Sequence, residues 1–248
     1  MVTFSNELNI CFSRCFNLYF RNFLITMKIS LGFISVLMAI ASLSFAQDNM
    51  IGVNIKVYQP LSGMAANIGA VPFGLSFNYL RSLRQTRFSA GGEIGVAMYS
   101  SNDYTLSYQG RDILVNEEDC FWTFHGVVRY DFVKTPRFIS YVTAKLGMTT
   151  FFSSITAMEA NSTYPGTFDF HGSAFNTGIG GGIMFRPKKP TTQDAGGFWI
   201  NLGATFHSGS ETDYRYMPEG GPAVPLDAGH YESLTHYMGY RLGFVFKF

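Results

Sequence analysis

The sequence predicts an all-β fold, an eight-stranded antiparallel up-and-down transmembrane β-barrel. Three observations predict it: apolar and polar residues alternate in the last segment, the same pattern recurs in earlier segments, and short turns alternate with long connections. Charged residues make up only 14% of the chain and aromatic residues 17%. With frequent Gly and no long apolar run after residue 46, this composition fits a membrane β-barrel better than a helical membrane protein.

The last segment, 237–248, shows the alternation most clearly. Leu242 and Phe246 belong to one set of alternate residues, and Gly239 and Arg241 belong to the other. A period of two places the two sets on opposite faces of a β-strand. One face is therefore apolar throughout, and the other carries small and charged groups. A barrel wall that faces lipid needs this arrangement, apolar outside and polar inside.

Seven earlier segments repeat the pattern, so the predicted strands number eight in all. They are 50–58, 70–81, 87–100, 120–133, 138–153, 173–186, 197–208 and 237–248. The connections 83–86, 134–137 and 187–196 are short, whereas 59–69, 101–119, 154–172 and 209–235 are mostly longer and rich in Gly, Ser, Asn and Asp. Short periplasmic turns and long extracellular loops are typical of outer-membrane barrels, and closure removes exposed strand edges.

The N-terminal region predicts a secretory signal over residues 27–46. Met27 and Lys28 precede an apolar stretch, and Ser44 and Ala46 place small residues where a signal peptidase reads. The stretch is short for a spanning helix, although a retained anchor is the alternative. Residues 1–26 are interpreted as an extension from an upstream start codon chosen in error, with a genuine long leader as the alternative. The mature domain is then 47–248.

The charge and cysteine content of the mature chain excludes several classes of function. Residues 1–46 hold three of the 18 basic and one of the 17 acidic residues, which leaves a net charge of about −1. A nucleic-acid partner would need a basic stripe, so none is predicted. Only Cys120 remains, so neither a disulfide within the chain nor a metal site of paired Cys can form. The His spacing matches no known ligand pattern, and we predict no metal and no cofactor.

Charged residues on the predicted inner face form the candidate functional site. Five of them fall at similar middle heights: Lys56, Glu93, Arg129, Lys145 and Arg241. Side chains fill the interior of an eight-stranded barrel, and buried lone charges are costly, so these groups must pair. We expect a salt-bridge plug in which Glu93 is shared among Arg129, Lys145 and Arg241. The alternative is a gate on a narrow ion path, which would favour anions because the layer is basic.

Aromatic residues near the predicted strand ends are candidates for the girdles at the two membrane interfaces. Tyr58 and Tyr99 lie near the long connections, and Tyr141 lies near a short turn. Ordinary strand aromatics are the alternative.

The signal, the alternating strands and the terminal Phe together resemble the small outer-membrane β-barrel families, of which OmpA and OmpX are familiar members. The PorT-like barrel proteins of Bacteroidetes are closer in style, since they often pair this layout with a signal ending in Ala-Gln, here Ala46-Gln47. The resemblance covers residues 27–248. Unlike OmpA, the chain has no peptidoglycan-binding domain after the barrel, which argues against a cell-wall tether.

The resemblance implies an outer-membrane location in a Gram-negative bacterium, with outer-membrane lipid and lipopolysaccharide as surroundings. It also implies that the barrel-insertion machinery reads the C-terminal signal, Phe248 with Phe246 and Phe244 before it. The long loops would offer a site for an extracellular ligand. A role in a secretion system is suggested by the PorT-like resemblance alone.

Three functions follow as hypotheses. The preferred one is a non-enzymatic barrel with a structural or surface-interaction role and a closed lumen, and a narrow porin is the first alternative. The second is a lipid A-modifying enzyme, because enzymes of that kind use His, Ser and an acidic residue near the outer rim, and residues 207–211 lie there. However, His207 and Ser208 are neighbours on a strand and point to opposite faces, and Gly209 stands where that family has Ser. No catalytic residue is predicted.

Overall fold

The computed structural model describes residues 49–68, 70–83, 86–108, 111–159, 166–187, 197–215 and 230–248. The predicted leader extension and signal, residues 1–46, lie outside the described residues. In the part of the chain that the model describes, no helix is both long enough and apolar enough to cross a bilayer.

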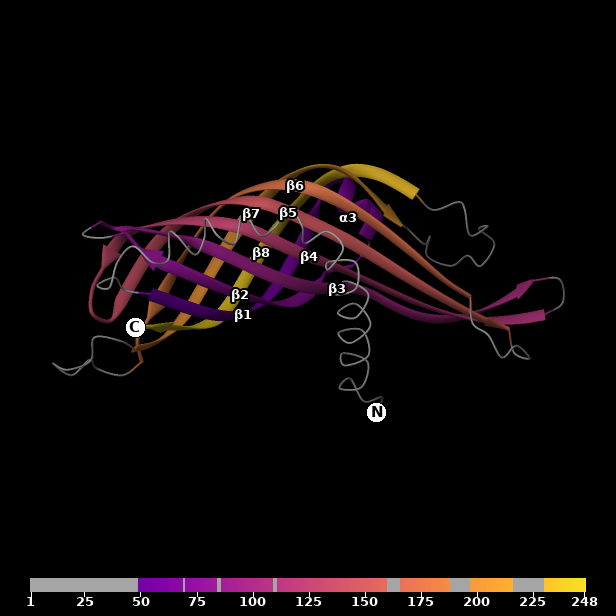
Figure 1. Ribbon diagram of the computed structural model, residues 1–248, viewed down its shortest axis with the longest axis horizontal. Helices are drawn as coiled ribbons and strands as arrows, with labels where there is room; N and C mark the ends of the chain where they lie inside the picture. The colour runs from indigo at the N-terminus through magenta and orange to yellow at the C-terminus, as the bar shows by residue number, and fades with distance from the viewer. Residues whose placement is uncertain are drawn as a thin grey trace, which may run out of the picture. The chain divides into compact units, whose positions relative to one another are not determined.

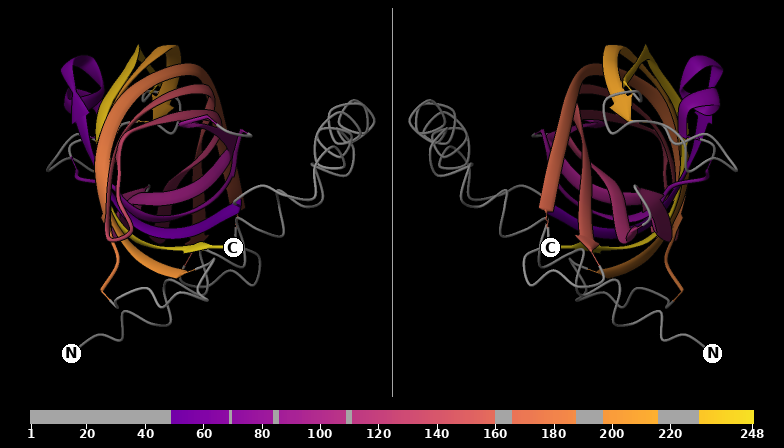
Figure 2. Two further views of the ribbon diagram at one scale, coloured as in Figure 1. Left: turned by 90° about the vertical axis from the view of Figure 1, so that its left-hand side faces the viewer. Right: turned by 90° about the vertical axis from the view of Figure 1, so that its right-hand side faces the viewer.

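Eight antiparallel strands form a closed barrel in chain order, as the sequence predicts. The elements are β1 (Asn49–Leu61), α3 (Ser62–Ile68), β2 (Phe73–Ser82), β3 (Phe88–Tyr108), β4 (Arg111–Lys134), β5 (Phe138–Glu159), β6 (Gly166–Phe185), β7 (Gly197–Arg215) and β8 (His230–Lys247). Each strand pairs with the next, and β1 pairs with β8 from Met50↔Lys247 to Leu61↔His236. Figure 1 shows the strands from the side, and Figure 2 shows how they close into a ring.

Two tight turns join strands at one end of the barrel, which we call the short-turn end. Between β2 and β3, the Leu83 amide donates to the carbonyl of Phe88. Between β4 and β5, the Thr135 amide donates to the carbonyl of Phe138. Thr86 and Thr135 each add a side-chain hydrogen bond inside their turn. The predicted short turns at 83–86 and 134–137 are therefore confirmed.

At the opposite, long-strand end, several strands run well beyond the predicted ends. The predicted loop 101–119 is largely a hairpin, because β3 and β4 stay paired as far as Tyr108↔Arg111. The four strands β3–β6 project furthest at this end (Figure 1). The sequence prediction failed here because the period of two reports burial of one face. Within 101–119, Tyr104 and Leu106 do alternate with polar residues, but the Gly, Ser, Asn and Asp content of the segment made it look like a loop.

The predicted connection 59–69 is shifted along the chain to 62–72 and contains a helix. Strand β1 continues to Leu61, and α3 follows it directly. Ser62 starts the helix with a φ of 50°, a left-handed conformation that reverses the chain direction at the end of β1. Strand β2 begins at Phe73 instead of residue 70, after Pro72, whose carbonyl accepts from the Tyr58 amide.

The outer wall of the barrel is apolar on every strand. One exposed apolar side chain from each strand in turn illustrates it: Val53, Phe73, Ile94, Val128, Leu146, Ile179, Leu202 and Leu242. The alternate residues point inward and are buried, many of them polar. This reverses the arrangement of a soluble barrel and fits a wall that faces lipid. The inward and outward faces predicted from the sequence are confirmed for all eight strands.

Candidate functional site

The side chains in the lumen form layers. Their order can be followed along β4, whose inward-facing residues are the odd-numbered ones. From the short-turn end, the layers fall at Arg129 and Asp131, then at His125, and then at Phe121. Glu93 on β3 lies directly opposite His125 in the β3–β4 register. The lumen therefore has a lower apolar layer, a charged middle layer and an upper aromatic layer, in that order.

The lower layer is a buried apolar cluster that encloses one ion pair. Its members are Met50, Leu80, Val127, Ile139, Tyr141, Met184, Trp199 and Val245. Arg129 Nε donates to Asp131 Oδ1 at 2.6 Å, and the guanidinium lies 4.0 Å from the centroid of the Tyr141 ring. Arg129 thus has its own carboxylate and an aromatic face, both inside the lower layer.

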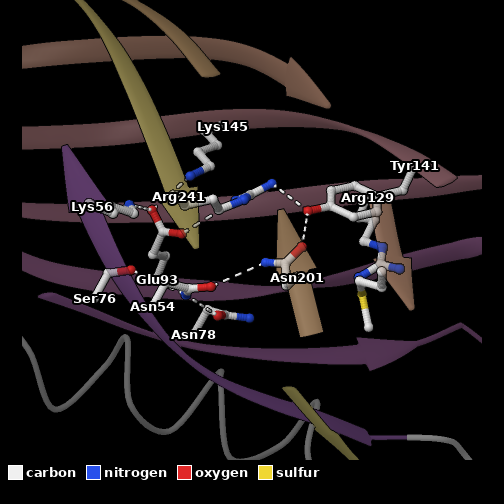
Figure 3. A network of polar contacts seen from close by, with 11 residues as sticks. Asn54, Lys56, Ser76, Asn78, Glu93, Arg129, Tyr141, Lys145, Asn201 and Arg241 are labelled. Carbon is white, nitrogen blue, oxygen red and sulfur yellow. Dashed lines mark hydrogen bonds and ion pairs between the residues drawn. The ribbon is translucent and has the colours of Figure 1, made fainter. Parts of the chain in front are cut away.

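The middle layer joins three cations to one carboxylate. Lys56 and Lys145 both donate to Oε1 of Glu93, at 2.6 and 2.7 Å, and Arg241 Nη1 lies 3.8 Å from Oε2. The four side chains come from β1, β3, β5 and β8, so the cluster crosses the lumen (Figure 3). The structure places Glu93, Lys56, Lys145 and Arg241 together, whereas Arg129, which we expected on Glu93, pairs with Asp131. The reason is their different positions along the barrel axis. Arg129 lies two inward-facing residues closer to the short-turn end than His125, the residue opposite Glu93.

A chain of neutral polar groups extends from the cluster toward β2. Arg241 donates to the Tyr141 hydroxyl, at 2.9 Å, and this hydroxyl donates to Asn201. Asn201 donates to Asn54 at 3.1 Å, and Asn54 donates to Asn78 (Figure 3). Sequence reasoning missed this network because amide side chains carry no charge to balance. Their inward position on β1, β2 and β7 was the available signal.

The upper layer is a buried aromatic cluster to which both the strands and helix α3 contribute side chains. It contains Tyr58, Met64, Ala97, Tyr99, Phe121, Phe151 and Tyr237. The Tyr58 ring contacts Phe121 edge-on, with centroids 5.0 Å apart, and contacts Tyr237 at 5.5 Å. Met64 enters from α3 and is fully buried. Tyr58, Tyr99 and Tyr141 all point inward, so these three are not part of an interfacial girdle.

Two histidines lie between the middle and upper layers. The rings of His125 and His207 lie 5.0 Å apart, and His207 stacks on Tyr237 at 4.5 Å. His207 is buried on the inner face of β7, while Ser208 is on its outer face and Ser210 accepts from the Phe175 amide. No described contact links His207 to either serine. Among the described residues, no three His, Cys, Asp or Glu side chains are grouped as a metal site would require.

The C-terminal Phe residues lie on the outer wall. Phe244, Phe246 and Phe248 are exposed, as is Phe198 beside them on β7. The Phe198 ring lies 5.3 Å from Phe244 and 5.4 Å from Phe246. The C-terminal strand thus presents an aromatic patch to the lipid side of the short-turn end.

Comparison with known proteins gives fold-level likeness only. No family model and no curated protein matches the chain. Among solved structures, Ail, the attachment invasion locus protein of Yersinia pestis crystallised with the heparin analogue sucrose octasulfate, shares 11% identity at a TM-score of 0.48, covering 82% of this chain and all of that one. Neisserial surface protein A shares 8% at 0.44 over 80% and 95% of the two chains. A major outer membrane protein from Thermus thermophilus shares 13% at 0.39 over 81% and 99%.

The closed barrel and its exposed apolar wall decide where the protein resides. All backbone strand pairs close on themselves, and lipid-facing side chains are apolar on each strand. The chain is an outer-membrane β-barrel. Barrels of this type belong to the envelope of Gram-negative bacteria.

Proposed function

We propose that this outer-membrane protein is a barrel with a closed lumen, acting in envelope structure or in surface interaction through its long-strand end. One observation carries the first half. The charged layer around Glu93 lies between two buried side-chain clusters, apolar below and aromatic above. An ion crossing the lumen would have to displace side chains from all three layers, which is costly in a well-packed interior.

The long-strand end supports the surface role. Strands β3–β6 carry exposed or half-exposed acidic side chains there: Asp103, Asp112, Glu118 and Asp169. Arg111 is the one lysine or arginine in the described part of these extensions, so the acidic residues outnumber it. A partner bound at this surface would therefore be cationic. A sulfated polyanion, such as the heparin analogue bound by Ail, is the opposite chemistry.

The surroundings of the barrel follow from its outer wall. We propose that outer-membrane lipid and lipopolysaccharide cover the apolar belt. In this proposal, the barrel-insertion machinery recognises the aromatic patch of Phe244, Phe246 and Phe248. A cleaved signal over residues 27–46 would deliver the chain across the inner membrane.

Conductance in planar bilayers tests the closed lumen. We expect refolded wild-type protein to show no current steps. A triple variant, Glu93→Ala with Phe121→Ala and Met184→Ala, should show them, because it removes one side chain from each of the three layers. The matched control is Val128→Ala with Phe175→Ala and Leu146→Ala, three lipid-facing positions that should stay silent. Steady openings of wild type would overturn the closed lumen.

A narrow porin is the second candidate, and one observation favours it. Three basic side chains surround a single carboxylate in the middle layer, so any open path through this layer would be lined mainly by basic groups. Anion-selective steps in wild type would support this function. We propose no enzymatic function, because the geometry of His207 and Ser208 offers no base within reach of a nucleophile.

A further inference from the structure

The basic side chains of the middle layer outnumber its acidic ones. Lys56, Lys145 and Arg241 surround a single carboxylate, that of Glu93. Asp131, the carboxylate of the lower layer, is already hydrogen-bonded to Arg129. Glu117 and Asp119 lie beyond Phe121, at the long-strand end. Surplus basic groups in a barrel interior either lose a proton or gain a counter-charge, and a guanidinium such as that of Arg241 keeps its charge.

The cluster also holds more hydrogen-bond donors than Glu93 can accept. Each lysine ammonium has three N–H groups, and both lysines direct one of them to the same oxygen, Oε1. Arg241 uses Nη2 for Tyr141, while its buried Nε has no partner among the described residues. Donors thus point into the lumen from three sides of the carboxylate.

A buried histidine supplies a second, independent sign of a ligand. His125 is only 4% exposed, and it lies opposite Glu93 in the β3–β4 register. In the described part of the chain, neither of its ring nitrogens has a hydrogen-bond partner. A neutral imidazole has one N–H group that can donate to an anion.

We infer that a small inorganic anion of the halide class binds in the lumen among Lys56, Lys145, Arg241 and His125. The inference rests on the proposed closed lumen. The anion accepts hydrogen bonds from the ammonium groups and the imidazole, and it compensates charge that Glu93 alone does not. Charge-assisted hydrogen bonds of this kind are among the stronger ones in proteins. The bound ion is then a structural part of the plug.

Halide dependence of unfolding tests the site. The refolded barrel is unfolded in urea in a series of buffers in which gluconate is replaced stepwise by bromide. The ionic strength is held constant, so that the screening of charges stays equal. We expect the wild-type midpoint to rise with bromide, since a ligand bound to the folded state alone stabilises it. Lys145→Gln should bind roughly tenfold more weakly, about the loss of one charge-assisted hydrogen bond. Lys134→Gln, an exposed site with the same charge change, should match wild type.

Two results would overturn the site. One is a wild-type midpoint that does not change with bromide, and the other is a Lys145→Gln dependence equal to that of wild type. If Lys145→Gln does not refold, anomalous diffraction from wild-type crystals grown in bromide replaces it. A bromide peak within hydrogen-bond distance of the lysine Nζ atoms supports the site, and no peak there overturns it.

The outcome is separable from that of the closed lumen. If the wild-type protein shows no current steps and its unfolding does not respond to bromide, the anion site is contradicted and the closed lumen is supported. If the wild-type protein conducts steadily and its unfolding still responds to bromide, the anion site is supported and the closed lumen is contradicted.

Discussion

At the scale of single residues, Glu93 is the centre of the lumen. It is 5% exposed, and its carboxylate accepts from two lysines on strands that are not its neighbours. A buried carboxylate with such partners is difficult to replace, because its removal leaves several buried cations facing one another. Arg129 has a separate environment, with Asp131 as its acceptor and Tyr141 beneath its guanidinium. The lumen therefore contains two ionic groups with separate carboxylates, and an arginine of each group contacts Tyr141.

A double-mutant cycle tests this separation. We expect Glu93→Gln and Lys145→Gln to couple by about 1–3 kcal/mol in the free energy of unfolding, since the two side chains are in direct contact. The free-energy changes of Glu93→Gln and Arg129→Gln should add to within about 0.5 kcal/mol, as for sites that share no partner. Urea unfolding of the refolded variants measures both cycles. Strong coupling between Glu93 and Arg129 would contradict this separation and would support the contact between them that the sequence predicts.

At the scale of the strands, the outer wall is specified by alternation and the strand ends are not. Residues on β6 illustrate the first point: Phe175 and Ile179 face outward, while Asn176 between them is buried. The extension of β3 and β4 illustrates the second, since their pairing continues through a segment whose composition predicts a loop. Hydrogen bonds between backbones carry that pairing, together with contacts such as Asn116 to Asp103.

Ile179→Arg tests whether the wall faces lipid. Ile179 is 69% exposed on the middle of β6, and an arginine at the bilayer midplane should cost about 2–4 kcal/mol of folding free energy. Ser101→Arg, on an exposed site of β3 near the long-strand end, is the control and should cost about 0–1 kcal/mol. Folding into lipid vesicles, followed by urea titration, gives both values. Equal costs at the two sites would contradict a membrane-facing position for Ile179.

The helix α3 is an element whose place only the folded structure reveals. It contacts β8 and β1, and it inserts Met64 into the upper aromatic layer. A seven-residue helix is too short to be stable alone, so tertiary packing holds it. The segment 59–69 thus contributes to the lumen core instead of forming an open loop.

At the scale of the whole molecule, the two ends differ in charge and in length. The described short-turn end carries exposed Arg87, Lys134 and Arg137, while the long-strand end carries the acidic side chains of β3–β6. Both lumen clusters lie within the part of the barrel where all eight strands are present. Folding and surface interaction should therefore be separable by truncation.

Replacing residues 103–116 with an Asn-Gly turn, which joins the paired residues Asn102 and Glu117, tests this separation. The shortened barrel should still fold, because the clusters around Glu93 and Phe121 keep nearly all their members. It should bind polylysine less than the full-length protein does, since two acidic residues, Asp103 and Asp112, are removed with one basic residue, Arg111. Heat-modifiable electrophoretic mobility reports folding, and cells displaying each form report binding. Unchanged polylysine binding by a folded, truncated barrel would contradict a surface role for these acids.

The local pattern of residues was enough to establish the number of strands, their order and which face of each predicted strand points inward. It was enough because the inward or outward direction of a side chain depends on a period of two. The polarity of the lumen and the apolar wall follow from the same period, as Arg241 and Leu242 illustrate on β8.

Which inward residues meet depends instead on the tertiary structure. Glu93 and Arg241 lie on strands far apart in the sequence, and the heights at which they face each other depend on the stagger of all eight strands around the barrel. Arg129 lies two inward-facing positions away from the level of Glu93, and it forms its ion pair with Asp131. The same holds for Met64, whose burial depends on packing across the barrel mouth and not on the pattern of its own segment.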